Sequence, residues 1–247
     1  MIDAEFGAGR AVALQADVTN GDDCKQTVDL ALESFGRLDI LVNNVGIGGP
    51  DGSAVNVDPK QWARGLEINV TGMMLMAKYA VPAMENNALD GISGRGSIIN
   101  ISSVSGLKGG APKLLYPTSK GAIVNMTRAM AVHHAPMGIR VNCVCPGAFS
   151  ILILYPALIF HLLNILIGTL HTPRMYAGGM PPEVREARKN RSLLKTEGTG
   201  WDCGAAVRFL ASEQARWITG VALPVDAGAT AAVAGSGFSV FSSLAKM

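Results

Sequence analysis

The order of apolar and polar residues predicts alternating strands and helices, beginning with a strand in the apolar run RAVALQA at residues 10–16. Between residues 22 and 35, apolar or thiol residues follow steps of four and three, which is the spacing of one face of a helix. These positions are Cys24, Val28, Ala31 and Phe35. Gly36 ends the predicted helix, and residues 38–42, LDILV, form a short strand of continuous apolar residues. Together the three segments predict a βαβ unit.

The alternation continues to the end of the chain. Asp58 and Pro59 mark a helix start, after which an apolar stripe extends for several turns. Its members are Leu66, Val70, Met73, Ala77, Val81 and Met84. Further strands are expected at residues 97–101, 139–144 and 220–225, and further helices from about Tyr116, at 182–190 and at 202–210. These elements predict an α/β protein, and the serine-rich residues 231–247 predict a flexible C-terminal tail.

Composition narrows the class of protein. The 247 residues are 49% hydrophobic and 16% charged, which suits a single large α/β domain with a sizeable core. The net charge is +2 without a run of lysine or arginine, so we expect neither nucleic acid nor a membrane surface as a partner. The four cysteines show no CxxC spacing, which predicts reduced thiols, no metal site and a cytoplasmic protein. A small-molecule substrate is therefore the expected partner.

The stretch from Gly96 to Lys120 carries the first candidate chemistry. It contains a strand followed closely by Ser103, then a glycine-rich loop, and then Tyr116 and Lys120 four residues apart. On a helix that starts near Tyr116, this spacing places the phenol and the ammonium on one face, one turn apart. A nearby cation lowers the pKa of a tyrosine from its usual value of ~10. The pair can then exchange a proton with a substrate oxygen that Ser103 holds.

The same residues also have ordinary structural interpretations. A tyrosine and a lysine at this spacing often form a solvated pair on a helix. Residues 43–46, NNVG, follow the strand at 38–42, at the edge where open α/β sheets bind their ligands, but asparagine and glycine also suit a plain turn. Asn69 lies inside the long predicted helix, where an asparagine more often has a local or solvent role. Each motif alone is therefore weak evidence of function.

Taken in order, the motifs resemble those of the short-chain dehydrogenase/reductase family over about residues 1–149 and 171–230. The matching segments are ADVT at 16–19, NNVG at 43–46, INV at 68–70, Ser103, YxxxK at 116–120, CPG at 145–147 followed by Thr172, and VDAG at 225–228. In the family these correspond to the adenine-contacting segment, the NNAG motif, the catalytic asparagine, serine, tyrosine and lysine, the PGxxxT element and the terminal VDGG. The resemblance rests on the collinear order, which single motifs do not provide.

The resemblance implies a Rossmann-like, doubly wound parallel sheet and reversible hydride transfer between NAD or NADP and a carbonyl or secondary alcohol. Tyr116 would exchange the proton with the substrate oxygen, and Lys120 would lower the pKa of the tyrosine and bind the nicotinamide ribose. Ser103 would hold the substrate oxygen, and Asn69 would anchor a proton-relay water. The implied cofactor-binding residues are Asp17, Val18, Asn43, Val45, Gly46, Tyr116, Lys120, Pro146, Gly147 and Thr172. The family also implies a homo-oligomer, either a dimer or a tetramer.

The beginning of the chain departs from the family's pattern. Family members begin with a strand, a TGxxxGxG turn and a helix whose N-terminus holds the cofactor's pyrophosphate. This chain opens with MIDAEFGAGR, which resembles the end of the helix before the family's third strand. We therefore expect the sheet to lack its first βαβ segment, residues 10–16 to lack a neighbouring strand, and the pyrophosphate to be held weakly.

A second departure is the apolar insertion at residues 150–170, SILILYPALIFHLLNILIGTL. Without it, PGAF would join HTPR and restore the family's PGxxxT spacing. Residues 151–170 are long and apolar enough to span a bilayer, and a substrate-lid helix is a further interpretation. We favour a retained intron or a mis-called exon, because a membrane anchor here would interrupt the lip of the cofactor and substrate site. A mature transcript and purified protein that carry these residues would contradict this hypothesis.

Three functions follow from these observations. The motif order favours an NAD(P)-dependent oxidoreductase with a single Rossmann-like domain at residues 1–230. One alternative is a truncated, catalytically silent relative that cannot hold the dinucleotide. The other is a membrane-associated variant that uses residues 151–170.

Overall fold

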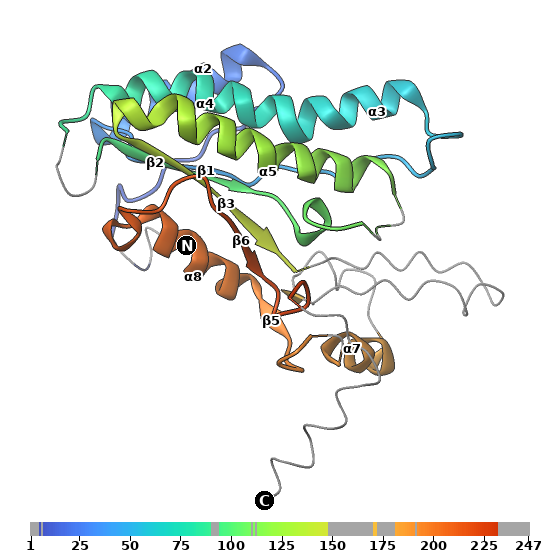
Figure 1. Ribbon diagram of the computed structural model, residues 1–247. Coiled ribbons are helices and arrows are strands. Elements are labelled where there is room, and N and C mark those ends of the chain that lie inside the picture. Colours follow the sequence, from blue (N-terminus) through green and yellow to red (C-terminus); the bar gives the residue numbers. More distant parts are fainter. Residues whose placement is uncertain are drawn as a thin grey trace, which may run out of the picture.

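A four-stranded parallel sheet forms the centre of the protein (Figure 1). The computed structural model describes residues 5, 7–89, 94–109, 111, 113–147, 170–171, 181–190 and 192–231. The strands of the sheet are, in spatial order, β1 (Ile40–Asn43), β2 (Gly96–Ile101), β3 (Ile139–Pro146) and β6 (Ala222–Val225). All three ladders are parallel. Parallel neighbours require crossover connections, and helices provide them.

Helices cover both faces of this sheet (Figure 1). One face carries α2 (Gly21–Phe35), α3 (Pro59–Leu66), α4 (Gly72–Glu85) and α5 (Leu115–His134). On the opposite face, α8 (Gly200–Ala211) packs against β2, β3 and β6. The remaining elements include α7 (Pro182–Lys189) and a small parallel pair, β4 (Leu170–His171) with β5 (Gly198–Thr199). This arrangement confirms the expected Rossmann-like α/β fold.

Local capping explains where α2 begins and ends and where α3 begins. The Asn20 side chain accepts a hydrogen bond from the Asp22 N–H at 2.9 Å, and Gly36 ends α2 in the left-handed conformation at φ 75°. The Asp58 side chain caps α3 by accepting from the Gln61 N–H at 2.8 Å. These caps satisfy backbone groups that a helix end otherwise leaves without partners.

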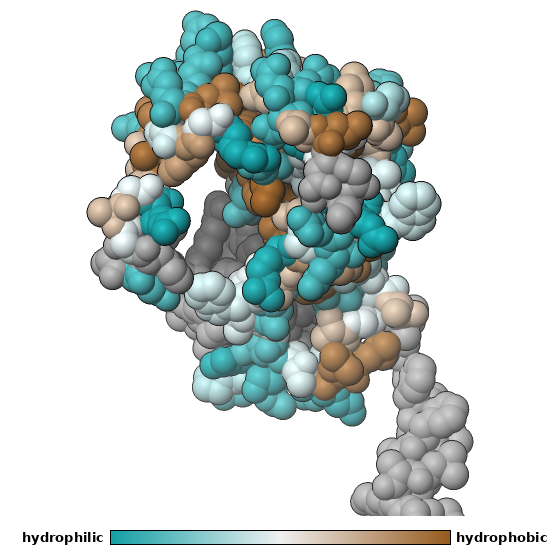
Figure 2. All heavy atoms as spheres, turned by 90° about the vertical axis from the view of Figure 1, so that its left-hand side faces the viewer, coloured by the Kyte–Doolittle hydropathy of each residue, from teal (hydrophilic) through white to brown (hydrophobic). Residues whose placement is uncertain are grey.

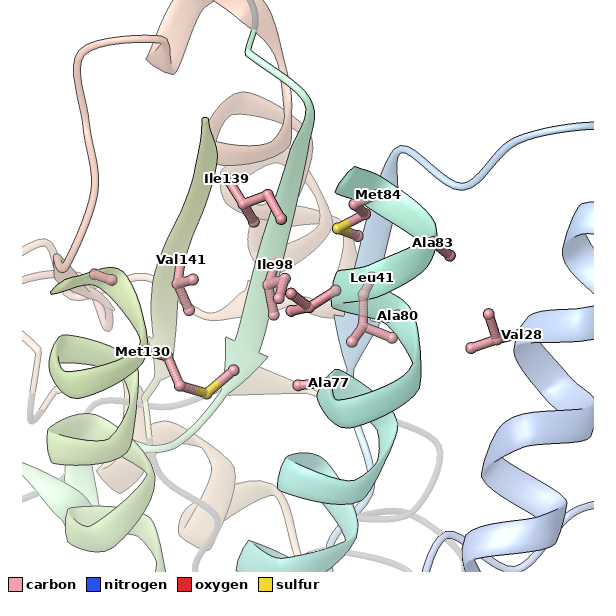
Figure 3. Close-up of a cluster of buried hydrophobic side chains, with 12 residues drawn as sticks. Val28, Leu41, Ala77, Ala80, Ala83, Met84, Ile98, Met130, Ile139 and Val141 are labelled. Atoms are coloured by element: carbon pink, nitrogen blue, oxygen red, sulfur yellow. The ribbon is translucent and has the colours of Figure 1, made fainter. Parts of the chain in front are cut away.

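One hydrophobic cluster joins the sheet to α4, α5 and α2, and Figure 3 shows its strand residues and Met84 of α4 lying close to one another. Leu41, Ile98 and Val141 come from three neighbouring strands, and Val28 reaches the outer side of α4 from α2. The buried members on α4 are Ala77, Ala80, Val81, Ala83 and Met84. The apolar stripe predicted along this helix is therefore its core face, and its burial orients α4 over β1 and β2.

A buried arginine helps to attach α8 to the other face of the sheet. Arg140 of β3 donates hydrogen bonds to the carbonyls of Leu210 at 2.7 Å and of Ala211 and Ser212 at 3.2 Å. The carbonyls at the end of a helix lack intrahelical partners and carry partial negative charge, so a guanidinium there satisfies them. Leu210 also packs with Ile99 and other residues of the strands in a second cluster.

The predicted strand at residues 10–16 is wrong. The structure has no strand at residues 11–17, and the side chains of residues 11–16 are exposed. A strand is stabilised by a ladder of hydrogen bonds to a neighbour, and in the described part of the chain β1 pairs only with β2. Apolar, β-forming residues alone therefore do not produce a strand here, as the expected loss of the neighbouring strand implied.

The insertion and the tail lie largely outside the described residues. Of residues 150–170 only Leu170 is described, and it belongs to β4. The predicted tail at 231–247 is described only at its first residue. Within the part of the chain that the structure describes, no helix is long and apolar enough to cross a membrane.

Candidate active site

Several of the predicted site residues lie at the carboxyl ends of β1, β2 and β3 and at the start of α5. Figure 2 shows the opposite end of the molecule, from which the strands start. On that face, hydrophobic residues form only small patches between hydrophilic ones. At the carboxyl end, Gly46 follows β1, Ser103 follows β2, and Gly147 follows β3. Parallel strands bring their carboxyl ends to one edge, which is where open α/β sheets bind ligands.

Lys120 is the most deeply placed cation of this edge. Only 4% of its surface is exposed, and its Nζ donates a hydrogen bond to the Ile101 carbonyl at 3.0 Å. The same Nζ lies 5.7 Å from the ring centroid of Tyr116, one turn earlier on α5. Burial lowers the pKa of Lys120 from 10.5 to about 8, because a charged amine loses hydration there. The predicted proximity of the amine and the phenol is present in the structure.

Asn69 lies in a π-helical turn, Glu67–Thr71, that joins α3 to α4. A π turn is a local widening that is often found at functional sites. The buried Asn69 amide accepts from the Ile47 N–H at 2.8 Å and donates to the Ile47 carbonyl at 2.9 Å. It also donates to the Ser119 hydroxyl at 3.0 Å. Asn69 therefore connects the segment after β1 to the first turn of α5.

Ser103 is held by a short 3₁₀ turn, Val104–Gly106, that packs on α5. Its hydroxyl caps this turn by accepting from the Ser105 N–H at 3.1 Å, and the residue is almost fully buried. The turn approaches α5 so closely that a Cβ on Gly106 would lie 2.5 Å from the carbonyl carbon of Lys120. The neighbouring Ser102 hydroxyl donates to the Lys120 carbonyl at 2.7 Å. The serine-bearing turn and the lysine-bearing helix thus form one packed unit.

Two predicted cofactor residues lie at the entrance of α2, in the ADVT segment. Asp17 is exposed, and hydrogen bonds from the N–H and hydroxyl of Thr19 lower the pKa of its carboxyl group. Val18 packs against α4, because a Cβ on Gly72 would meet its Cγ2 at 2.7 Å. Arg64 of α3 contacts both the Asp17 carboxylate and the Thr19 hydroxyl. The segment is therefore anchored to α3 and α4.

The other predicted cofactor residues differ in burial and in their hydrogen bonds. Asn43 is buried, and its amide donates to Asn100 Oδ1 at 2.9 Å and to the Met73 carbonyl at 3.3 Å, so its side chain holds the sheet to α4. Val45 is partly exposed after β1. Pro146 and Gly147 are buried at the end of β3, where the Gly147 N–H bonds to the Val225 carbonyl at 2.9 Å. Thr172 lies outside the described residues.

Ser119 was not among the predicted site residues, yet it contacts two of them. Ser119 is fully buried, receives a hydrogen bond from Asn69 and donates one to the Tyr116 carbonyl at 2.9 Å. The one available signal is its position directly before Lys120, inside the YxxxK motif. The Ile101 carbonyl was also missed, since any residue type there offers the same acceptor.

The residues at this edge suit a nicotinamide cofactor. A Cβ on Gly46 would lie 3.2 Å from the Lys120 Nζ and 3.6 Å from Asn69 Oδ1, so glycine lets the backbone approach the amine closely. A buried amine beside a phenol can hold a ribose hydroxyl and tune a proton transfer. A parallel α/β sheet with this pair at its carboxyl edge defines an oxidoreductase of the Rossmann-like class.

Comparison with known proteins identifies the family. The short chain dehydrogenase family model matches residues 2–152, and the enoyl-(acyl carrier protein) reductase model matches residues 164–230. The chain is 32% identical to meso-2,3-butanediol dehydrogenase of Serratia marcescens, over 92% of this chain and 78% of that protein. It is 36% identical to 2-(S)-hydroxypropyl-CoM dehydrogenase 3 of Xanthobacter autotrophicus, over 92% and 81%. The chain therefore belongs to the short-chain dehydrogenase/reductase family.

A solved structure of a relative supports the type of cofactor. ElxO with NADP bound is 26% identical and superimposes with a TM-score of 0.72, covering 94% of this chain and 84% of ElxO. The protein is thus an NAD(P)-dependent oxidoreductase that transfers a hydride between the nicotinamide and an alcohol or carbonyl substrate.

Proposed function

We propose that Tyr116 is the proton donor and acceptor of a reductase or dehydrogenase acting on a small carbonyl or secondary alcohol. Bound NAD or NADP supplies or accepts the hydride. During reduction of a carbonyl, Tyr116 gives its phenolic proton to the substrate oxygen, and during oxidation it takes the proton back. Ser103 donates a hydrogen bond to the same oxygen, which stabilises the negative charge that develops there.

Lys120 and Asn69 support this proton transfer. The ammonium of Lys120 favours the phenolate form of Tyr116 and binds the nicotinamide ribose. Asn69, in its π turn, anchors a relay water and orders the backbone around Ile47. Further contacts to the cofactor come from Asp17 and Val18, from Asn43, Val45 and Gly46, and from Pro146, Gly147 and Thr172.

The buried Lys120 beside the Tyr116 ring is the observation that carries this proposal. A lysine on an ordinary helix surface places its ammonium in water, because burial of an unpaired charge is costly. Here the amine is buried 5.7 Å from the ring centroid, and its pKa falls to about 8. Such an environment is typical of a lysine that participates in a reaction.

The first experiment tests the proposed role of Tyr116. With meso-2,3-butanediol and NAD or NADP as probes, Tyr116→Phe is expected to lower kcat by about 100-fold to 10,000-fold, the usual range for a general acid–base. Tyr79→Phe, on α4, is the matched control and is expected to retain turnover. Equal activity of the two variants contradicts the proposal.

A cofactor titration tests the alternative of a silent relative. We expect NADH or NADPH to raise the melting temperature of the purified chain, because a ligand of the folded state stabilises it by mass action. The absence of a shift with both dinucleotides at saturating concentration, together with no change in intrinsic fluorescence, contradicts the proposed enzyme.

We further infer a single domain over residues 1–230, a cytoplasmic location and a homo-oligomer. The family supports a dimer or tetramer that pairs through the helices carrying Asn69 and Tyr116. Four free cysteines are consistent with a reducing compartment. Sedimentation velocity on the purified chain tests the oligomer, since a monomer at all concentrations contradicts it.

A further inference from the structure

A glycine-rich segment at residues 46–52, GIGGPDG, leaves β1 and passes along the proposed catalytic residues. Its first half is fixed by two of them. Gly46 lies against the Lys120 amine, and Ile47 exchanges two hydrogen bonds with Asn69. The segment therefore lies directly against the buried amine and Asn69, and residues 46–52 are called the wall below.

The second half of the segment is held by residues directly before Tyr116. Leu115 is fully buried, and a Cβ on Gly49 would lie only 2.0 Å from its Cδ2, so the loop backbone rests on this side chain. Gly49 also has φ +71°, a conformation that suits glycine. The contact joins the wall to the residue that precedes the proposed proton donor.

Lys113 makes further contacts with the segment at residues 46–52. Its Nζ donates to the Gly49 carbonyl at 3.0 Å and pairs with Asp51 Oδ1 at 3.0 Å. The Lys113 side chain is 18% exposed, whereas that of Asp51 is 72% exposed. The Lys113 side chain is thus mostly covered, and its ammonium contacts the segment at two points, so it restrains the backbone more than a fully exposed ion pair would.

We propose that Lys113 is a positioning residue for the reaction. By binding Gly49 and Asp51, it holds residues 46–52 against the start of α5, next to Tyr116. The inference rests on the proposed function of Tyr116 and Lys120. Loss of Lys113 is expected to loosen the wall and weaken substrate placement, while the proton-handling residues stay in place.

Hydrogen–deuterium exchange of the full chain tests the restraint without requiring turnover. Lys113→Met removes both contacts and is expected to speed exchange in peptides covering residues 46–52 by about fivefold, the effect of losing roughly 1 kcal/mol of local stability. Asp51→Asn removes only the ion pair and should speed exchange in the same peptides by a smaller factor. The double variant should exchange no faster than Lys113→Met, because Lys113→Met already removes the ion pair. Asp51 is exposed, so Asp51→Asn is expected to fold normally even if Lys113→Met does not.

The matched control is Lys25→Met, which removes a similar lysine–aspartate pair on α2, far along the chain from the segment. It should leave exchange at 46–52 unchanged. Unchanged exchange in both Lys113→Met and Asp51→Asn overturns the proposal. A larger effect of Asp51→Asn than of Lys113→Met also overturns it, because Lys113 would then not be the residue that holds the segment.

Kinetics with meso-2,3-butanediol and NADP then separates a positioning role from a structural one. We expect Lys113→Met to raise KM about fivefold with kcat within about twofold, and Lys113→Arg to restore KM. An equal loss of kcat and kcat/KM, or no rescue by arginine, counts against positioning. A wild-type chain that neither turns over the probe nor binds either dinucleotide contradicts the proposed function, whereas the exchange experiment still decides the role of Lys113.

Discussion

At the scale of single residues, burial of the Lys120 amine lowers the stability of the fold but gives the amine a pKa that suits the proposed reaction. Removing a charged amine from water is unfavourable, and its hydrogen bond to the Ile101 carbonyl compensates only in part. The same burial brings the pKa of the amine to about 8, near the pH at which proton transfer is useful. Residues that reduce stability in this way are expected at sites that perform chemistry.

The first residue-scale prediction concerns the pH dependence of stability. The folded-state pKa of Lys120 lies below its ordinary value of 10.5, so between about pH 8 and 10.5 the unfolded chain binds more protons. The free energy of unfolding therefore rises with pH across that window. Relative to Lys120→Met, the wild type should gain on the order of 3 kcal/mol, measured by urea unfolding at a series of pH values. Parallel curves for the two proteins would contradict the burial of a titrating amine.

The second residue-scale prediction concerns the amide of Asn69. Asn69→Ala leaves the Ile47 N–H and carbonyl without their buried partner, and we expect a loss of about 2 kcal/mol in the free energy of unfolding. Ser119→Ala removes only one of the contacts of Asn69 and should cost about 1 kcal/mol. Urea unfolding measures both values. A smaller cost for Asn69→Ala than for Ser119→Ala would show that Ile47 does not depend on this side chain.

At the scale of elements, the prediction concerns the contact between the serine-bearing 3₁₀ turn and α5. A Cβ on Gly106 would lie 2.5 and 2.6 Å from the Lys120 carbonyl carbon and oxygen, and backbone atoms there cannot move aside cheaply. Gly106→Ala should therefore destabilise the protein by about 2 kcal/mol and lower turnover, because Ser103 moves with the turn. In Gly121→Ala the new Cβ would be 3.5 Å from its nearest neighbour, the Gly106 carbonyl oxygen, and alanine favours helices, so we expect up to ~1 kcal/mol of stabilisation. Thermal unfolding distinguishes the two signs, and destabilisation by both variants would contradict the packing.

Elements governed by local interactions were predicted well from the sequence. The helix start at Asp58 and the stop at Gly36 act within a few residues, and α3 begins and α2 ends accordingly. The long helix expected to follow Asp58 is instead divided into α3, a π turn and α4. The central strands β2 and β3 were also expected, because continuous apolar runs suit a sheet that is covered on both faces. The strand predicted at residues 10–16 is absent, because a strand depends on a neighbouring strand that a local pattern does not reveal.

The residue types of the candidate site could be predicted from the sequence, whereas most contacts between these residues could not. Tyr116 and Lys120 are neighbours on one helix, so their proximity follows from spacing alone. The link from Asn69 to Ser119 depends on how a π turn packs against α5, and that relation is tertiary. Lys113 was missed for the same reason, because its partners Gly49 and Asp51 lie far from it in sequence.

At the scale of the whole molecule, coverage of the sheet is uneven. α4 covers the face of β1 on which Leu41 lies, whereas α8 packs on β2, β3 and β6. Ile40 and Val42, on the other face of β1, are 46% and 42% exposed. In the described part of the chain, β1 also has a ladder partner on one side only. An edge strand with exposed apolar side chains is a template for pairing with another chain.

We therefore expect concentration-dependent association through β1, in addition to any fixed oligomer. Val42→Lys places a charge on this edge and should reduce the rise of the sedimentation coefficient with protein concentration. Its cost in folding free energy should stay below about 0.5 kcal/mol, since the side chain is already half exposed. Val55→Lys, at a loop position that is 94% exposed, adds the same charge away from the sheet and should leave association unchanged. If both variants reduce association equally, net charge rather than the strand edge controls it; if only Val42→Lys acts, the uncovered edge of β1 is the surface that associates.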